Sequence, residues 1–249
     1  SGNSLAYTLV VTLAVGLLCG VWNGFLVAIL NIQPIIATLV LMVAGRGIAQ
    51  LITEGVIMTF NDPGLIFFGS GSFAYLPMPV VIWLLVGAIV ILLVRRTALG
   101  MLVEAVGINR RASTLSGVRT PVLLMAVYML SALCAAIAGI IVAADIKGAD
   151  ANNAGLWLEL DAILAVVVGG NSLLGGRFSI LGSLIGAMII QAVNTGILLS
   201  GFPPEFNLII KAIIILVILI IQSPALQSAA AFFSRKPAES AGVRVEQPK

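Results

Sequence analysis

The chain has 249 residues, of which 60% are hydrophobic and only 9% are charged, with a formal net charge of +3. An average soluble domain is about a quarter charged, so this composition excludes a chain dissolved mainly in water and indicates membrane lipid as its surroundings. The apolar residues form uninterrupted blocks instead of an alternating pattern. This pattern excludes a transmembrane β-barrel and predicts an all-α fold, a polytopic membrane helix bundle.

Six apolar blocks are long enough to cross a bilayer, which takes roughly 20 residues in a helix. In chain order, the predicted spans are residues 5–30, 35–52, 79–94, 121–144, 180–199 and 207–222. A shorter block, 162–170, is either part of a span that begins near Leu156 or a half-helix that meets a glycine-rich break. We therefore predict about seven membrane segments in a transmembrane domain of residues 1–222. The chain opens on Ser1 without an initiator methionine or a charged leader, so we expect that residues are missing before it.

Two of the predicted spans carry glycines at four-residue spacing, which places them on one face of a helix. They are Gly16, Gly20 and Gly24 in one span and Gly182 and Gly186 in the other. Such a strip predicts the close approach of a second helix backbone. The stretch 169–176 is also rich in glycine. It predicts either a gate between half-helices or a tight cytoplasmic turn, and we favour the turn.

Most of the thirteen basic residues lie in the connection 95–120, at Arg177 and in the polar tail 223–249. The positive-inside rule predicts that these segments, including the C-terminus, are cytoplasmic in a bacterial inner membrane. The connections 53–78 and 145–161, which hold most of the acidic residues, are then extracytoplasmic. These connections, which include Asp62, form a negative surface together with Glu205. We expect this surface either to receive a binding protein through basic contacts or simply to be solvated.

The connection 95–120 is too long for a simple turn, and we expect a hairpin of two short amphipathic helices at the membrane surface. Gly107 is expected to end the first helix in the left-handed conformation, Asn109 to cap the second helix and Gly117 to close it. A protruding hairpin of this kind has the shape needed to dock in a groove of a soluble partner.

The faces of this hairpin are predicted from its charges. The apolar side of the first helix is expected to face the bundle, while Glu104, Arg110 and Arg111 project toward the cytosol. The alternative is an ordinary interfacial helix that is held by its apolar face, with the arginines near anionic lipid.

The chain contains no pattern for catalysis or for an energy source of its own. A Gly-x-x-x-x-Gly-Lys-Ser/Thr phosphate loop, histidine, a cysteine pair at metal-binding spacing and a Gly-x-Ser-x-Gly motif are all absent from the sequence. We therefore expect a non-catalytic subunit without a cofactor or metal. A secondary carrier, which is driven by protons or sodium ions, normally has ionisable groups deep within its spans. Only Arg46 and Lys211 are candidates for such groups, and neither suits a proton relay, so a secondary carrier is the weaker alternative. We therefore expect that a partner that hydrolyses ATP drives the movement of the helices.

Several motifs resemble those of permeases in the ribose and branched-chain amino acid transport family, the membrane subunits of ATP-binding cassette (ABC) importers. The run 100–118, with EAVGIN at 104–109 and LSGV at 115–118, is similar to their cytoplasmic loop. Further stretches that resemble the family are 22–24, 33–34, 37–39, 45–47, 169–177 and 194–196. The first spans that are usual in the family are absent from this sequence, so the resemblance implies that N-terminal spans are missing. The stretches 143–161 and 200–205 are similar to the members that transport galactofuranose.

The resemblance implies a permease that imports a monosaccharide, with galactofuranose as the expected cargo. Ribose or a branched-chain amino acid is the alternative within the family, and a structural membrane subunit is a further one. The implied partners are an ABC ATPase subunit that binds ATP and Mg²⁺, a periplasmic sugar-binding protein, and a second permease copy or paralogue; no nucleic acid is expected. The residues implied at the ATPase coupling surface are Glu104, Gly107, Asn109 and Gly117, with Arg110 and Arg111 beside them.

A sugar pathway needs hydrogen bonds and apolar ring contacts, which uncharged polar and aromatic side chains supply without the desolvation cost of a charge. The candidates within the predicted spans are Trp22, Asn23, Phe25, Gln50, Gln191 and Asn194. The alternative for Asn23, Gln191 and Asn194 is that they only hydrogen-bond neighbouring helices.

Overall fold

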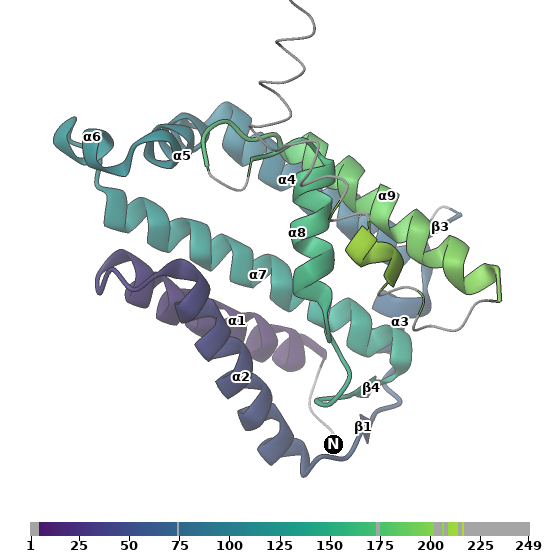
Figure 1. Cartoon of the computed structure of the whole chain (residues 1–249). Helices are drawn as coiled ribbons and strands as arrows, with labels where there is room; N and C mark the ends of the chain where they lie inside the picture. Colours follow the sequence, from purple (N-terminus) through teal and green to yellow (C-terminus); the bar gives the residue numbers. More distant parts are fainter. Residues whose placement is uncertain are drawn as a thin grey trace, which may run out of the picture. The chain divides into compact units, whose positions relative to one another are not determined.

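Five long apolar helices form the frame of the described chain, and each is long and apolar enough to cross a membrane. In the computed structural model they are α1 (Leu5–Ala28), α2 (Pro34–Thr53), α4 (Met78–Arg96), α7 (Thr120–Ile146) and α9 (Ile180–Leu199) (Figure 1). The structure describes residues 5–73, 75–172, 175–201, 206, 209–213 and 216. Pro34 begins α2 at a position where a helix needs no N–H donor.

These helices confirm five of the predicted spans, and α9 has the predicted ends. The helix α8 (Leu158–Val168) has 11 residues, too few to cross a bilayer alone, and Gly169 and Gly170 follow it directly. This agrees with the half-helix alternative for residues 162–170. Of the predicted span 207–222, only residues 209–213 and 216 are described, and they are helical. The predicted tail 223–249 lies outside the described residues.

The chain divides into two units, Ser1–Ala187 and Met188–Lys249. In the first unit, α1 and α7 lie side by side (Figure 1). A Cβ added at Gly16 would lie 2.6 Å from the Ala136 Cβ, and one at Gly20 would lie 2.8 Å from the Met129 Cα. Only glycine allows such an approach, so the predicted glycine strip on this helix is confirmed.

The end of α8 packs against the beginning of α9 through the second predicted strip. A Cβ at Gly182 would clash with the carbonyl oxygen of Gly169, and one at Gly186 with that of Ala165. The connection between the two helices is held by Asn171, which is only 6% exposed. Its side chain accepts from the Ser179 backbone N–H at 2.6 Å and donates to the carbonyl oxygens of residues 166 and 179 and to the hydroxyl of residue 183.

Short elements lie between the long helices, and the fold remains mostly helical, as predicted. The helix α3 (Pro63–Ser70) falls in the connection 53–78, which was expected to be a loop. Two antiparallel pairs of two-residue strands are also present: β1 (Met58–Thr59) with β4 (Gly148–Ala149), and β2 (Ser72–Phe73) with β3 (Leu76–Pro77). Strands of two residues carry no readable alternation, so the sequence pattern could not reveal them.

Large apolar side chains cover the outside of the helices. Leu51 is 81% exposed and Val10 is 66% exposed, whereas few large side chains, such as Leu164, are buried. Soluble proteins bury most residues of this kind, so the surroundings of these helices are apolar as well, as lipid or neighbouring protein would be.

Candidate functional site

The loop between β1 and α3 forms one wall of a cavity at the ends of α1 and α7. The β1–β4 pairing places Thr59 opposite Gly148, and the Phe60 N–H donates to the Lys147 carbonyl oxygen at 3.1 Å. These backbone bonds hold the loop against the segment that follows α7. The position of the loop is therefore fixed by backbone pairing between two distant connections.

The sequence after this loop begins α3 at a defined point. The Asp62 Oδ1 accepts a hydrogen bond from the Gly64 N–H at 2.8 Å, and Pro63 occupies the first turn. Asp followed by Pro is a favoured start of a helix, because the carboxylate satisfies a free N–H and proline needs none. The cap leaves the Asp62 side chain half-buried at the cavity wall.

The cavity has a volume of about 680 Å³, within the range of roughly 300–1,000 Å³ that is usual for small-molecule sites. Its wall combines hydroxyl, amide and carboxylate groups with apolar surface from three separate segments. The lining residues are Thr8, Thr12, Thr59, Phe60, Asn61, Asp62, Leu65, Gly139, Ile140, Ala143 and Ala149. We call this space the polar cavity.

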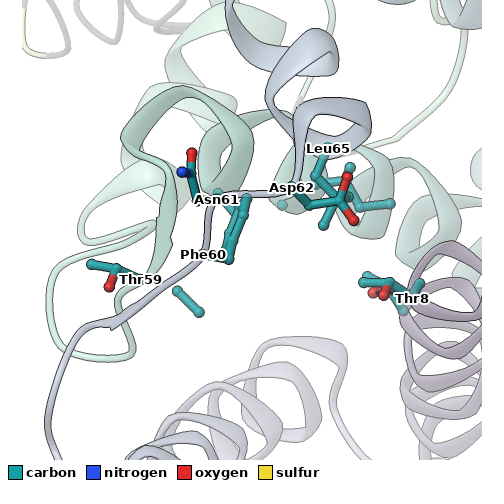
Figure 2. A pocket seen from close by; sticks show the side chains of 11 residues that line it. Thr8, Thr59, Phe60, Asn61, Asp62 and Leu65 are labelled. Carbon is teal, nitrogen blue, oxygen red and sulfur yellow. Dashed lines mark hydrogen bonds between the residues drawn. The ribbon is translucent and has the colours of Figure 1, made fainter. Parts of the chain in front are cut away.

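The polar cavity presents an aromatic ring beside hydrogen-bonding groups. Figure 2 shows the Phe60 ring below the loop and the Asp62 carboxylate turned toward the side on which Thr8 lies. Asp62 accepts hydrogen bonds, whereas a side-chain amide such as Asn61 both donates and accepts. A compact molecule with several hydroxyl groups and one apolar face matches this combination, because the ring covers the apolar face while the polar groups bind the hydroxyls.

A second, apolar cavity of about 470 Å³ adjoins the polar cavity. It lies between α2, α7 and the connection 148–158. The two cavities share Gly139, Ala143 and Ala149 in their walls. Small residues therefore separate a polar space from an apolar one at this end of α7.

The connection after β4 is tied to α2 by Asn152. Its Nδ2 donates to the Gly55 carbonyl oxygen at 2.8 Å, and its Oδ1 accepts from the Gln50 Nε2 at 2.9 Å. The Asn152 backbone carbonyl accepts from the Arg46 Nη1 at 2.8 Å. Arg46 is thus bound to a connecting segment.

The turn around Asn152 is organised by the half-buried carboxylate of Asp150. The Asp150 side chain accepts from the Asn153 amide at 3.0 Å, and its Oδ1 also accepts the backbone N–H groups of Asn153 and Asn152. These hydrogen bonds lower the pKa of Asp150, with the side-chain bond from Asn153 contributing most and the charge of Arg46 contributing least. The ionised carboxylate is therefore the form that stabilises this turn.

None of the predicted pathway residues that belong to the first unit lines the polar cavity. Asn23 is 11 residues beyond Thr12 on α1, about 16 Å along the axis, and its buried Oδ1 has no hydrogen-bond partner in the described part of the chain. Trp22 and Phe25 are 53% and 38% exposed.

The remaining pathway candidates have different surroundings. Gln50 joins the Asn152 cluster described above. Gln191 and Asn194 belong to the second unit, where Gln191 is exposed. The Asn194 Oδ1 is buried without a partner among the residues that the structure describes. The alternative that Asn23 and Asn194 hydrogen-bond neighbouring helices therefore finds no support in the described chain, and the pathway role of all six residues stays a prediction.

The expected hairpin of two short helices is present as α5 (Ala98–Ile108) and α6 (Arg110–Leu115) (Figure 1). Asn109 ends α5 and caps α6, and its Oδ1 accepts the Ala112 N–H at 3.0 Å, as predicted. Gly117 follows α6 with a positive φ of 89°. The prediction for Gly107 was wrong: this residue lies inside α5 without a positive φ, because the helix continues to Ile108 and Asn109 provides its end.

The charged residues of the hairpin differ in their contacts. Glu104 is half-buried and lines a cavity of about 280 Å³ with Arg95 and Phe178, so it does not project freely as expected. Arg110 is exposed, and its Nη2 donates to the Asn31 Oδ1 at 3.1 Å, which joins the hairpin to the turn between α1 and α2. Arg111 is exposed, as expected.

Gly107 lies against the glycine-rich connection before α9. A Cβ added at Gly175 would lie 2.6 Å from the Gly107 carbonyl oxygen, and Gly175 has a φ of +93°. A Cβ added at Gly107 would lie 3.3 Å from the Gly176 backbone N. The hairpin and this connection therefore meet through backbone atoms with no side chain between them.

Sequence reasoning missed most of the polar cavity. Asp62 was named only as part of an acidic surface, and Thr8, Phe60 and Asn61 were not singled out. The usable signal was the Asn61-Asp62-Pro63 sequence, which is typical of a capped helix start that holds polar side chains in place. No local sequence pattern indicated that Gly139 and its neighbours on α7 would line the polar cavity.

Comparison with known proteins gives a family for almost the whole chain. Residues 1–219 match the family described as branched-chain amino acid transport system / permease component. The chain is 65% identical over 223 residues to the galactofuranose transporter permease protein YtfT of Escherichia coli K12, which covers 90% of this chain and 65% of that protein. No solved structure is significantly similar to the chain.

Other sugar permeases are also similar. The identity is 40% over 243 residues to the fructose import permease protein FruF of Bifidobacterium longum, which covers 96% of this chain and 68% of that protein. The chain is 38% identical over 211 residues to the ribose import permease protein RbsC of Haemophilus influenzae, which covers 83% of this chain and 65% of that protein. The chain spans about two thirds of the length of these relatives. Because the family model matches residues 1–219, this chain belongs to the branched-chain amino acid transport system permease family.

Proposed function

We propose that the chain is the membrane-spanning permease subunit of an ABC importer and carries a monosaccharide, galactofuranose, across the bacterial inner membrane. The observation that carries this proposal is the 65% identity to a galactofuranose permease over 90% of the chain. The polar cavity supports it independently, because its hydroxyl, amide, carboxylate and aromatic groups suit a neutral polyol. In this proposal the cavity is open to the extracytoplasmic side and receives the sugar from a periplasmic binding protein.

The importer draws its energy from a partner, because the sequence contains no phosphate loop. An ABC ATPase subunit binds ATP and Mg²⁺ and docks on the cytoplasmic hairpin α5–α6, and a second permease copy or paralogue completes the pathway. Arg95, Arg96 and Arg119 flank the hairpin, and their charge favours the cytoplasmic side. The C-terminus is then cytoplasmic as well.

Two contacts of the hairpin can pass its movement on to other helices. Gly107 touches the connection that leads into α9, and Arg110 binds the turn that joins α1 to α2. A displacement of α5–α6 by the ATPase therefore acts on helices at both contacts. The Gly107 contact is the stiffer of the two, because it joins backbone to backbone, whereas Arg110 reaches its partner through a long exposed side chain.

The test is transport by the complete transporter in liposomes, assembled from the full permease, the ATPase and the binding protein. We expect uptake of radiolabelled galactofuranose that requires ATP and the loaded binding protein. Fructose, ribose and leucine are offered in parallel with their own binding proteins, because relatives for other sugars are also similar. Uptake driven by an ion gradient without ATP would contradict the importer, and uptake of leucine alone would contradict a sugar as cargo.

A further inference from the structure

The helix α7 contains a single glycine, Gly139, in its interior. Glycine weakens a helix relative to alanine because it loses more backbone freedom on folding. On α1, Gly16 and Gly20 offset this cost, because their missing side chains allow α1 to pack closely against α7. A Cβ at Gly139 would meet no described atom within 4 Å outside its own stretch of helix, so packing within the described chain does not require glycine there.

The space beside Gly139 belongs to both cavities. Gly139 lines the polar cavity together with Thr12 and Asp62, and it lines the apolar cavity together with Ala135 and Leu158. A side chain at this position would therefore point into open volume where the two cavities adjoin. Gly45 and Gly47 on α2 also have no atom within 4 Å of an added Cβ, but they line neither cavity.

We propose that Gly139 is a specificity-determining residue of the sugar pathway, because its missing side chain leaves the room through which the sugar passes between the polar and the apolar cavity. This inference rests on the proposed function. The hydroxyl groups of the sugar remain bound by the polar cavity, while its bulk passes over the bare backbone of α7. A hexose with an exocyclic carbon chain needs this room more than a smaller sugar does.

Substitutions at Gly139 should separate helix stability from sugar uptake. Gly139→Ala strengthens the helix, and Gly139→Val adds branched bulk to the open volume. We expect Gly139→Ala to lower galactofuranose uptake by a few-fold and Gly139→Val by about tenfold or more, as pocket contacts of this size discriminate substrates. ATP hydrolysis stimulated by the loaded binding protein should fall less than uptake in both variants, because the hairpin that docks the ATPase is unchanged.

The matched control is Gly45→Val, which adds the same side chain to a helix glycine with equally open surroundings that lines neither cavity. Its uptake should stay within twofold of the wild type. Equal losses in Gly45→Val and Gly139→Val, or wild-type uptake by Gly139→Val, would overturn the role of Gly139. Absence of galactofuranose uptake by the wild-type transporter would instead overturn the proposed function itself.

A labelling experiment keeps the inference testable if Gly139→Val does not assemble. The free cysteines Cys19 and Cys134 are replaced by serine, and Gly139→Cys is introduced into the full transporter. A membrane-impermeant thiol reagent should then label residue 139 from the outside and stop uptake, and bound sugar during turnover should slow the labelling. A residue that is never labelled, or is labelled without effect on uptake, would contradict the proposal.

Discussion

The two ends of the first unit are held together by different chemistry. At the polar cavity, the backbone pairing of β1 with β4 is joined by side-chain hydrogen bonds, from Asn152 to Gly55 and from the Gly64 N–H to Asp62. At the hairpin, backbone meets backbone at Gly107 and Gly175, and the joint between α5 and α6 is one asparagine. The first end therefore depends on strand pairing and side-chain hydrogen bonds, whereas the second depends on a close contact between glycine backbones. This difference suits a site that binds a ligand at one end and an element that transmits force at the other.

Gly175→Ala should have the largest effect on transport. Its φ of +93° disfavours any side chain, and an added Cβ would press on the Gly107 carbonyl oxygen. Strain of this kind costs about 1–3 kcal/mol before the clash is counted, so we expect ATP-driven uptake to fall more than tenfold. The measurements are uptake and ATP hydrolysis by the reconstituted transporter.

Gly170→Ala separates the clash from the strain. Gly170 has a φ of +82°, but an added Cβ there would meet nothing within 4 Å. Its loss of uptake should therefore be clearly smaller than that of Gly175→Ala. Equal losses would show that the contact with the hairpin has no special part in coupling.

At the opposite end, Asp62→Asn removes a charge and keeps the start of α3. Asparagine caps a helix about as well as aspartate, so the thermal stability should not change. A hydrogen bond to a charged group contributes about 1.5–3 kcal/mol, so we expect roughly a tenfold rise in the concentration of sugar needed for half-maximal uptake. Asp62→Ala is the comparison, since it also removes the cap and should lower stability. An unchanged half-maximal concentration in Asp62→Asn would exclude this carboxylate from sugar binding.

A smaller effect is expected for Asn152→Ala, which removes the side-chain bonds to Gln50 and Gly55. Net losses of about 1 kcal/mol per hydrogen bond are typical, so the melting temperature in detergent should fall by a few degrees. Asn153→Ala is the control, since its side chain binds only within its own turn. A larger fall in Asn153→Ala would show that Asn152 does not tie the connection to α2.

The smallest expected effect concerns acid. The pKa of Asp150 is lower in the folded chain than its ordinary value of 3.8. Its contribution to stability is therefore fully present well above pH 3.8 and is lost as the pH falls through the lower, folded pKa. Melting temperatures recorded from neutral to acid pH should show a slightly shallower decline for Asp150→Asn than for the wild type. Identical declines would remove Asp150 from the acid sensitivity of the chain.

The long helices were predictable because each is a block of apolar residues whose length matches a bilayer. Residues 180–199 were predicted with the observed ends, and 35–52 differs from α2 by one residue at each end. The helix α3 and the strand pairs are too short for a sequence period. Gly107 was misassigned because a glycine near a helix end usually closes it, whereas here Asn109 does so one residue beyond the last helical position.

The polar cavity was less predictable than the helices for a different reason. Its wall joins Thr8, Asn61 and Gly139, which are far apart in sequence and meet only after β1 pairs with β4 and α1 packs on α7. The coupling residues were named from a resemblance to a family, and their part in docking an ATPase stays a prediction. The structure adds that Glu104 lines a cavity and that Gly107 touches a second glycine segment.

The single asparagine between α5 and α6 also constrains how this protein can change in evolution. Because Asn109 ends one helix and starts the next, there is no spare linker to absorb an inserted or deleted amino acid. One residue added at the start of α6 would turn the rest of that helix by about 100° around its axis and move the exposed arginines away from their present direction. Homologues should therefore tolerate length variation in the connection 53–78 far more readily than at this joint.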